Sequence, residues 1–175
     1  MKTILVTGGA GYIGSHTVVE LMKADYNVII VDNFSNSNPT YLNKLFKLCN
    51  ELFSKSPILY NRDCRSSLID ILSEHKVDAV IHFAAHKAVG ESVEKPLEYY
   101  DNNINSLLSI LNDCKNFGIN NIVFSSSCSL YGDVETLPVD EQTPISDPQS
   151  PYAYTKLVVH SFPTRRSSDD RKSVV

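Results

Sequence analysis

Tyr152 and Lys156 have the types and spacing needed to take a proton from a substrate hydroxyl. A spacing of four places both side chains on one face of a helix. A tyrosine with a pKa near ~10 is a poor base, but a nearby ammonium group stabilises the phenolate and lowers that pKa. The pair therefore predicts a proton acceptor. A surface tyrosine beside a solvated lysine is the alternative. Tyr154 is only two residues from Lys156 and lies on a different face.

Three consecutive serines, Ser125–Ser127, follow an apolar run at residues 121–124. Ligands of open α/β sheets bind outside the carboxyl ends of the strands, so these hydroxyls could hold or relay a substrate hydroxyl. On their own they are equally typical of a turn.

The glycine-rich segment at residues 7–14 (TGGAGYIG) predicts a dinucleotide site, because it follows a strand and opens a helix. Gly8, Gly11 and Gly14 permit a tight turn close to a pyrophosphate, and the helix N-terminus adds N–H donors. Asp32 stands about 20 residues further on, where a carboxylate binds a ribose 2′-hydroxyl and repels a 2′-phosphate. Together they predict NAD rather than NADP, and a flexible turn with a chance aspartate is the alternative.

The elements that must position these residues alternate short apolar runs with longer amphipathic ones. Continuous apolar runs are typical of strands buried on both faces, and predict strands at residues 3–6, 27–32, 57–60, 78–83 and 121–124. Helical spacing predicts helices over residues 12–24, 41–53, 97–117 and 151–160, and a further helix that begins at residue 68. Gly118 is expected to end the helix over 97–117, and Pro151 to begin the last one. Five strands with intervening helices predict an α/β fold, a doubly wound parallel sheet of the Rossmann type.

The composition is that of a soluble globular domain. The chain has 175 residues, 42% of them hydrophobic, and a formal net charge of −4, which argues against a nucleic-acid or anionic-membrane partner. No segment approaches the ~20 apolar residues of a membrane span. The four cysteines form no CxxC pair, as expected for reduced thiols in the cytoplasm. We expect no metal site, because His82 and His86 straddle a strand end.

Over about residues 2–160 the chain resembles the UDP-glucose 4-epimerases of the extended short-chain dehydrogenase/reductase family. The segments that carry the resemblance are residues 7–14, 82–92 (HFAAHKAVGES), 95–103 (KPLEYYDNN), 124–127, 131–133 and 148–152. The stretch 87–103 is specific to the epimerases.

The resemblance implies a role for each matching residue. Tyr152 would be the catalytic base, Lys156 would tune it and hold the nicotinamide ribose, and Ser127 would bind the sugar 4-hydroxyl. Lys87, Ser127 and Tyr152 would contact the substrate. The implied NAD contacts are Gly8, Gly11, Tyr12, Ile13 and Gly14 near the pyrophosphate, Asp32, Asn33, Asn36 and Ser37 near the adenosine ribose, Asp63 and Cys64 at the adenine, and Phe83, Ala84, Ala85, Lys87, Asn102, Tyr152 and Lys156 on the nicotinamide side.

The implied reaction interconverts UDP-glucose and UDP-galactose through a transient 4-keto sugar, with NAD regenerated in each turnover. The implied partners are a UDP-sugar and, in the complete protein, a second copy of the chain. A nucleotide-sugar 4,6-dehydratase of the same family is a rival, but such enzymes carry a Thr-Asp-Glu-like acid pair where this chain has Ser126-Ser127-Cys128. The sequence is also compatible with a 4-epimerase acting on a different UDP-sugar, and with a non-enzymatic NAD-binding regulator.

The family continues with further strands and a substrate domain, so the resemblance predicts a truncated, inactive fragment. We expect residues 1–160 to form an incomplete NAD-binding domain. Residues 161–175 have no apolar period and resemble a translated sequencing adapter, so we expect a disordered, non-native tail.

Overall fold

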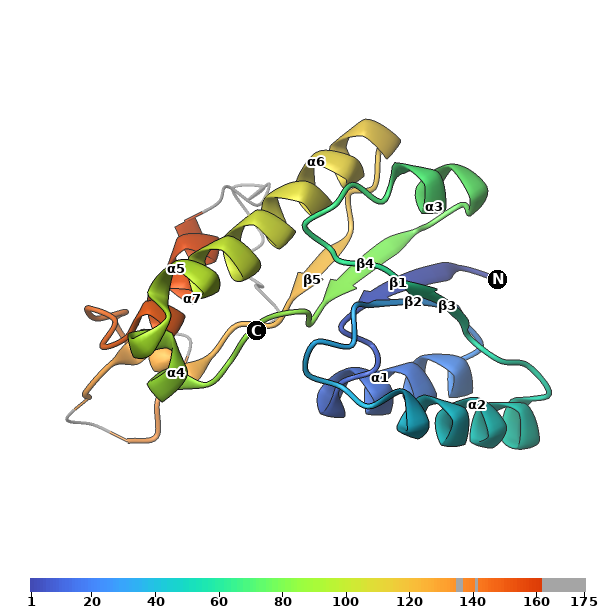
Figure 1. Cartoon of the computed structure of the whole chain (residues 1–175), viewed down its shortest axis with the longest axis horizontal. Helices are drawn as coiled ribbons and strands as arrows, with labels where there is room; N and C mark the ends of the chain where they lie inside the picture. Colours follow the sequence, from blue (N-terminus) through green and yellow to red (C-terminus); the bar gives the residue numbers. More distant parts are fainter. Residues whose placement is uncertain (135–136, 141, 162–175) are drawn as a thin grey trace. The chain divides into compact units, whose positions relative to one another are not determined.

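The structure of the protein is a computed structural model that describes residues 1–134, 137–140 and 142–161. The chain divides into two compact units, shown in Figure 1. Unit 1 comprises Met1–Ala85 and Asn105–Ser125, and unit 2 comprises His86–Ile104 and the described residues from Ser126 onward. The predicted NAD-binding domain over residues 1–160 includes parts of both units. The predicted tail beyond Ser161 lies outside the described residues.

Unit 1 contains the predicted parallel sheet. Its strands are β1 (Thr3–Thr7), β2 (Asn27–Asp32), β3 (Ile58–Asn61), β4 (Ala79–His82) and β5 (Ile122–Phe124). All pairings are parallel, in the order β3-β2-β1-β4-β5. The chain runs outward from β1 to β3 and then returns to β4, so the topological switch lies between β1 and β4, where ligands bind in such sheets.

Helices cover both faces of this sheet, as predicted. On one face lie α1 (Tyr12–Lys23) and α2 (Pro39–Phe53), and on the other lie α3 (Ile69–Glu74) and α6 (Ser106–Phe117) (Figure 1). Alternation along each strand divides its side chains between two cores. The core under α1 and α2 contains Ile4, Val6, Val28 and Ile30, and the core under α3 and α6 contains Leu5, Ile29, Val31 and Val80.

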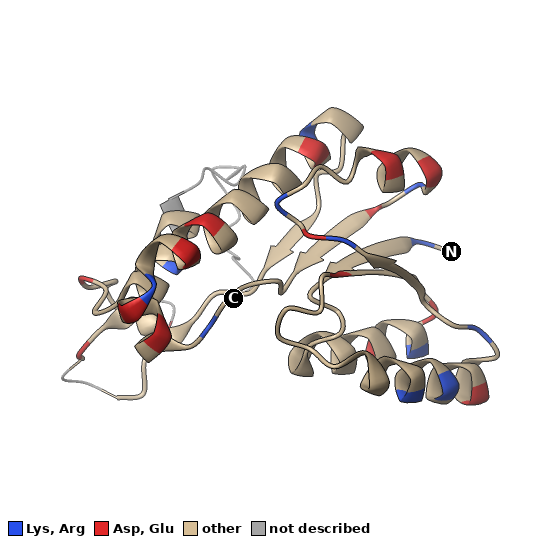
Figure 2. Cartoon of the chain, viewed as in Figure 1, with Lys and Arg blue, Asp and Glu red and all other residues tan. Residues whose placement is uncertain are grey.

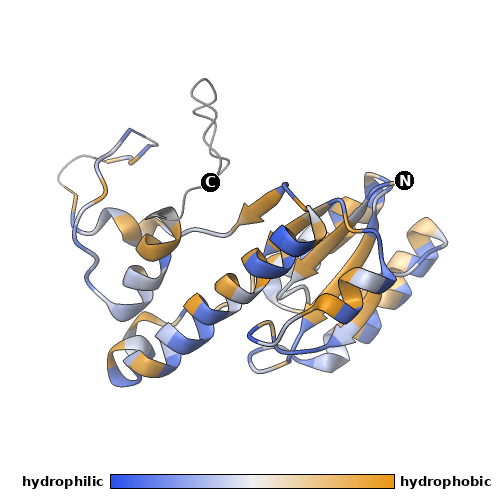
Figure 3. Cartoon of the chain, turned by 90° about the horizontal axis from the view of Figure 1, so that it is seen from above, coloured by the Kyte–Doolittle hydropathy of each residue, from blue (hydrophilic) through white to orange (hydrophobic). Residues whose placement is uncertain are grey.

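The strands are apolar on both faces, and in Figure 3 they form the most continuous hydrophobic part of unit 1. Asp32, the last residue of β2, is the one Asp, Glu, Lys or Arg within the bounds of the five strands. Charged residues lie instead mainly on helices and loops (Figure 2). A buried charge needs compensating partners, so this position indicates a specific use for the Asp32 carboxylate.

Unit 2 contains α4 (Val89–Glu94), α5 (Pro96–Tyr100), the 3-10 helix η2 (Cys128–Tyr131) and α7 (Pro151–Ser161), and α7 packs against the other three. Pro151 begins α7 as predicted. The short helix α4 was not predicted, because its six residues are too few for an apolar period.

The helix predicted over residues 97–117 is wrong as a continuous α-helix. The structure divides it into α5, a π-helical turn η1 (Asp101–Asn105), and α6. The wide turn contains Asn103, which is buried and whose amide hydrogen-bonds the backbone of His86. Local propensity does not encode such a distant partner. Gly118 ends α6 in the left-handed conformation (φ 68°), as predicted.

Asp113 on α6 anchors the start of α3, and its replacement is expected to destabilise unit 1. This buried carboxylate accepts hydrogen bonds from Ser67 Oγ (2.9 Å) and from the Leu68 backbone N–H (2.6 Å). Asp113→Ala leaves a buried N–H without its partner, so we expect a loss of roughly 2–4 kcal/mol of unfolding free energy. This loss is measured by urea unfolding, with circular dichroism as the signal. Asp113→Asn, which keeps one acceptor oxygen, should lose less, and an alanine variant as stable as the parent contradicts the prediction.

Candidate nucleotide-cofactor and proton-transfer sites

The glycine segment forms a tight turn between β1 and α1 at the switch point of the sheet. Gly8 has φ +68° and donates its N–H to the Val31 carbonyl (2.8 Å), while Gly11 donates to the Gly8 carbonyl (3.1 Å). A Cβ on Gly8 would lie 2.7 Å from the Ala84 backbone nitrogen. Only glycine allows this left-handed turn to pack so closely against the loop after β4, and the turn leads directly into the N-terminus of α1, an arrangement that suits a pyrophosphate.

Asp32 connects this turn to the loop after β2. Its carboxylate accepts hydrogen bonds from Ala10 N (3.0 Å), Phe34 N (2.9 Å) and Ser37 Oγ (3.0 Å). A carboxylate has about four acceptor positions, so these bonds orient the group and leave capacity for a ligand hydroxyl. The geometry suits a ribose at the end of β2.

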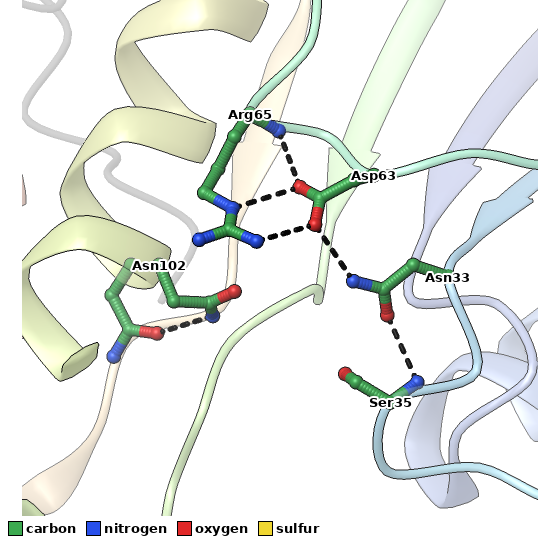
Figure 4. A network of polar contacts seen from close by, with 6 residues as sticks. Asn33, Ser35, Asp63, Arg65 and Asn102 are labelled. Atoms are coloured by element: carbon green, nitrogen blue, oxygen red, sulfur yellow. Dashed lines mark hydrogen bonds and ion pairs between the residues drawn. The ribbon is translucent and has the colours of Figure 1, made fainter.

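A second carboxylate, Asp63, lies beyond the end of the neighbouring strand β3 (Figure 4). Arg65 donates to it from Nε (3.1 Å), from its terminal NH2 (2.8 Å) and from its backbone N–H (2.8 Å). Asn33 Nδ2 donates to the same group (3.0 Å), while Asn33 Oδ1 accepts from Ser35 N (3.0 Å). The Arg65 contacts, above all the side-chain hydrogen bonds, lower the pKa of Asp63 to about 2.

The loop after β4 is fixed by Thr7, the last residue of β1. Phe83 N donates to the Thr7 carbonyl (3.0 Å), and Thr7 Oγ1 lies 2.6 Å from His82 Nδ1. Burial raises the pKa of the nearby Cys64 thiol to about 12. Cys64 is therefore a neutral packing residue at neutral pH rather than a nucleophile.

Tyr152 and Lys156 lie on one face of α7 in unit 2, and Lys156 Nζ is 5.8 Å from the centroid of the Tyr152 ring. Tyr152 is 9% exposed and Lys156 4%, whereas Tyr154 is 47% exposed. The prediction that Tyr154 lies on a different face is thus confirmed. Burial lowers the pKa of Lys156 to about 8, so the ammonium form is still present at neutral pH.

Asn103 and Thr155 hold this part of α7 and were not predicted. Asn103 Nδ2 donates to Thr155 Oγ1 (3.0 Å) and to the His86 carbonyl (2.9 Å), while its Oδ1 accepts from His86 N (2.8 Å). Thr155 Oγ1 in turn donates to the Tyr152 carbonyl (2.7 Å). Asn102 Nδ2 also donates to Asn103 Oδ1 (3.0 Å). The available sequence signal was a run of polar residues, Asp101–Asn103, inside an otherwise amphipathic helix.

Ser127 is the N-cap residue of η2, and its side-chain oxygen is already used as an acceptor. Ser127 Oγ accepts from Ser129 N (3.2 Å) and from Ser129 Oγ (2.9 Å). With both acceptor positions occupied, the Ser127 hydroxyl is left to act as a donor. This favours a contact with an oxygen atom of a ligand.

The predicted site residues divide between the units. Those of unit 1 lie at or after the ends of β1, β2, β3 and β4 at the carboxyl edge of the sheet. Tyr12, Ile13, Asn33 and Asn36 are exposed there, and the others are Gly8, Gly11, Gly14, Asp32, Ser37, Asp63, Cys64, Phe83, Ala84 and Ala85. Those of unit 2 are Lys87, Asn102, Ser127, Tyr152 and Lys156, of which Lys87 is exposed.

Two further features are absent from the described part of the chain. Among those residues, no group of three or more His, Cys, Asp or Glu side chains is placed to hold a metal ion. Likewise, no helix within the described residues is both long and apolar enough to cross a membrane.

The chain is similar to proteins that are named for an enzymatic activity. UDP-glucose 4-epimerase 2 of Arabidopsis thaliana is 47% identical over 163 residues, which are 92% of this chain and 46% of the plant protein. The UDP-glucose 4-epimerase of Bifidobacterium longum, solved with NAD⁺ and UDP, superposes with a TM-score of 0.85 at 43% identity, over 91% of this chain and 47% of that one. The UDP-Glc/GlcNAc 4-epimerase of Campylobacter jejuni superposes with a TM-score of 0.83 at 32% identity, over 91% of this chain and 47% of that one.

The chain spans about half the length of the curated relatives that it matches. The family model described as GDP-mannose 4,6 dehydratase matches residues 5–167, most of the chain. The chain therefore belongs to the GDP-mannose 4,6 dehydratase family, and UDP-glucose 4-epimerases are relatives that it resembles over almost its whole length.

Proposed function

We propose that residues 1–160 bind NAD and that the complete protein interconverts UDP-glucose and UDP-galactose by epimerisation at C4, a step of galactose metabolism. The observation that carries the catalytic part is the buried Tyr152 and Lys156 pair on one face of α7. The glycine turn and Asp32 carry the NAD part, because the turn opens α1 at the switch point of the sheet and Ala10 N–H orients the Asp32 carboxylate beside it.

The chemistry assigns one task to each side chain. NAD⁺, held by the glycine turn and Asp32, would supply a reversible hydride acceptor for C4 of the sugar, so that the configuration at C4 can invert. Tyr152, as its phenolate, accepts the O4 proton at its phenolic oxygen and later gives it back. The Lys156 ammonium stabilises that phenolate, and burial strengthens their interaction. Ser127 donates a hydrogen bond to the sugar O4 through the proton that its contacts with Ser129 leave available.

Epimerisation is favoured over the 4,6-dehydratase reaction by the sequence after β5. A dehydratase needs an acid and a base for the loss of water, but this chain has Ser126, Ser127 and Cys128 there. A regulator that only binds NAD needs neither a buried lysine nor a tyrosine on its helix face. The relatives include an enzyme named for both Glc and GlcNAc, so UDP-N-acetylhexosamines are the second substrate class to assay.

We place the protein in the cytoplasm, with a UDP-sugar as its substrate and a second copy of the complete chain as its partner. The support is the resemblance to the UDP-glucose 4-epimerases.

A chimaera tests the proposal. Residues 1–160 replace the corresponding residues of the Arabidopsis thaliana relative, and conversion of UDP-galactose to UDP-glucose is followed. We expect turnover, and we expect Tyr152→Phe to lower it by roughly 10²–10⁴-fold without changing NAD content, because only the proton acceptor is lost. A folded, NAD-loaded chimaera that converts no UDP-sugar contradicts the proposal. Formation of a 4-keto-6-deoxy sugar would instead assign the dehydratase reaction.

A further inference from the structure

The network around Asp63 contains a residue whose role the proposed function does not assign, Arg65. Its guanidinium faces the Asp63 carboxylate as a fork, with Nε on Oδ1 (3.1 Å) and the terminal NH2 on Oδ2 (2.8 Å) (Figure 4). The Arg65 backbone N–H is a third donor, to Oδ1 (2.8 Å). Two parallel bonds fix the plane of a carboxylate, which a single contact does not.

The fourth donor is of a different kind. Asn33 Nδ2 donates to Asp63 Oδ2 (3.0 Å) from an exposed, neutral amide at the end of β2. A carboxylate has about four acceptor positions, so the three Arg65 bonds and this one fill them. A ligand that donates to Asp63 must therefore replace one of these donors. Asn33 is the donor that a ligand replaces most easily. Its amide is neutral, exposed and on a rotatable side chain, whereas two of the other donors belong to the charged guanidinium and the third is the backbone N–H two residues from Asp63.

The position of Asp63 indicates which part of a dinucleotide it meets. Arg62 N donates to the Asp32 carbonyl (3.1 Å), which joins the segment carrying Asp63 to the end of β2. If Asp32 binds the adenosine ribose, Asp63 lies one strand further out, where the base extends. A carboxylate only accepts hydrogen bonds, so it favours a base that presents an amino group over one that presents an oxo group.

We propose that Arg65 is a positioning residue that orients the Asp63 carboxylate to accept a hydrogen bond from the 6-amino group of adenine. This amino group replaces Asn33 Nδ2 as the donor to Asp63 Oδ2. The inference rests on the proposed NAD site and adds to it the residue that sets preference for the base. Arg65 acts through orientation rather than ionisation. Even at its ordinary value near ~3.9, the pKa of an aspartate leaves it charged at neutral pH.

The test compares NAD with nicotinamide hypoxanthine dinucleotide, in which an oxo group replaces the 6-amino group. Binding of both to the purified chain is measured by calorimetry at pH 7. The parent is expected to prefer NAD by roughly 10- to 100-fold, the range for a hydrogen bond to a charged group. Arg65→Met should bring the two affinities to within about threefold. Any general effect of losing a positive charge acts on both dinucleotides and cancels in the ratio.

Arg62→Met is the matched control. Arg62 is a neighbouring arginine in an ion pair with Asp70 (2.7 Å), so this variant makes the same change of charge away from Asp63 and should keep the preference of the parent. Arg65→Lys, which keeps the charge but not the fork, should restore the preference only in part. If circular dichroism shows that Arg65→Met does not fold, Arg65→Lys alone tests the inference.

The outcomes separate the inference from the proposed function. If both Arg65 variants keep the preference of the parent, or if the parent binds both dinucleotides equally, the role of Arg65 is overturned while NAD binding stands. If the folded parent binds neither dinucleotide, the proposed NAD site itself is overturned.

Discussion

Gly14→Ala is expected to abolish measurable NAD binding by this chain and to lower its stability by roughly 2–4 kcal/mol. A Cβ at this position would collide with the Gly8 carbonyl oxygen and would lie 2.8 Å from Gly9 Cα. Both obstacles are backbone atoms, so no side chain can rotate away and the turn itself must open. The loss does not come from backbone strain at Gly14, because its φ is not in the left-handed region.

The effect on NAD binding follows from the same collision. Opening the turn separates the Gly11 N–H from the Gly8 carbonyl (3.1 Å) and moves Ala10, whose N–H holds the Asp32 carboxylate (3.0 Å). The pyrophosphate and ribose contacts of the proposed site are thus lost together. Calorimetry measures the affinity and urea unfolding the stability.

Gly90→Ala provides the control for Gly14→Ala. Gly90 lies in α4, and a Cβ there meets nothing within 4 Å. Alanine is the better helix former by up to about 1 kcal/mol, so this variant should be at least as stable as the parent and bind NAD as well. A Gly14→Ala protein that binds NAD like the parent would show that the glycine turn does not form the cofactor site.

The parts of the fold that could be predicted depend on local signals. A strand buried on both faces requires an unbroken apolar run, and β2 provides one that ends in Asp32. The glycine turn is partly local as well, since Gly8 has a positive φ and a Cβ on Gly14 would meet Gly8 and Gly9 of the same segment. Gly118 and Pro151 mark helix ends by their own backbone preferences.

The parts that could not be predicted depend on distant partners. The π turn at Asp101–Asn105 accompanies hydrogen bonds from Asn103 to His86 and Thr155, which are 17 and 52 residues away. Propensity alone favours a continuous helix there. Arg65 was missed for a different reason. The resemblance indicates Asp63, but an arginine two residues after an aspartate is common on surfaces, and its fork onto the Asp63 carboxylate is visible only in the structure.

Lys156→Met is expected to make the protein more stable and the proposed enzyme inactive. Burial lowers the pKa of Lys156 from 10.5 to about 8, so the folded chain bears the cost of a buried ammonium at neutral pH. The difference corresponds to about 3 kcal/mol. Methionine has similar length and no charge, so much of this cost should be recovered as unfolding free energy.

The pH dependence identifies the origin of the gain. Between pH 8 and 10.5 the unfolded parent keeps the Lys156 proton that the folded parent loses, so its unfolding free energy rises with pH across this window. Below pH 8 both states hold the proton and the full cost is present. Lys156→Met lacks this rise, so its advantage over the parent should be large at pH 7 and should nearly vanish by pH 10.5.

Activity should change in the opposite direction. In the chimaera, Lys156→Met removes the charge that stabilises the Tyr152 phenolate, and we expect turnover to fall by at least about 10²-fold. Tyr152→Phe separates the two effects, since it should lose turnover while keeping the rise in stability between pH 8 and 10.5. Urea unfolding of all three proteins at pH 7 and 10.5 tests the prediction. A Lys156→Met protein that is less stable than the parent at pH 7 would show that the buried lysine contributes to folding rather than opposing it.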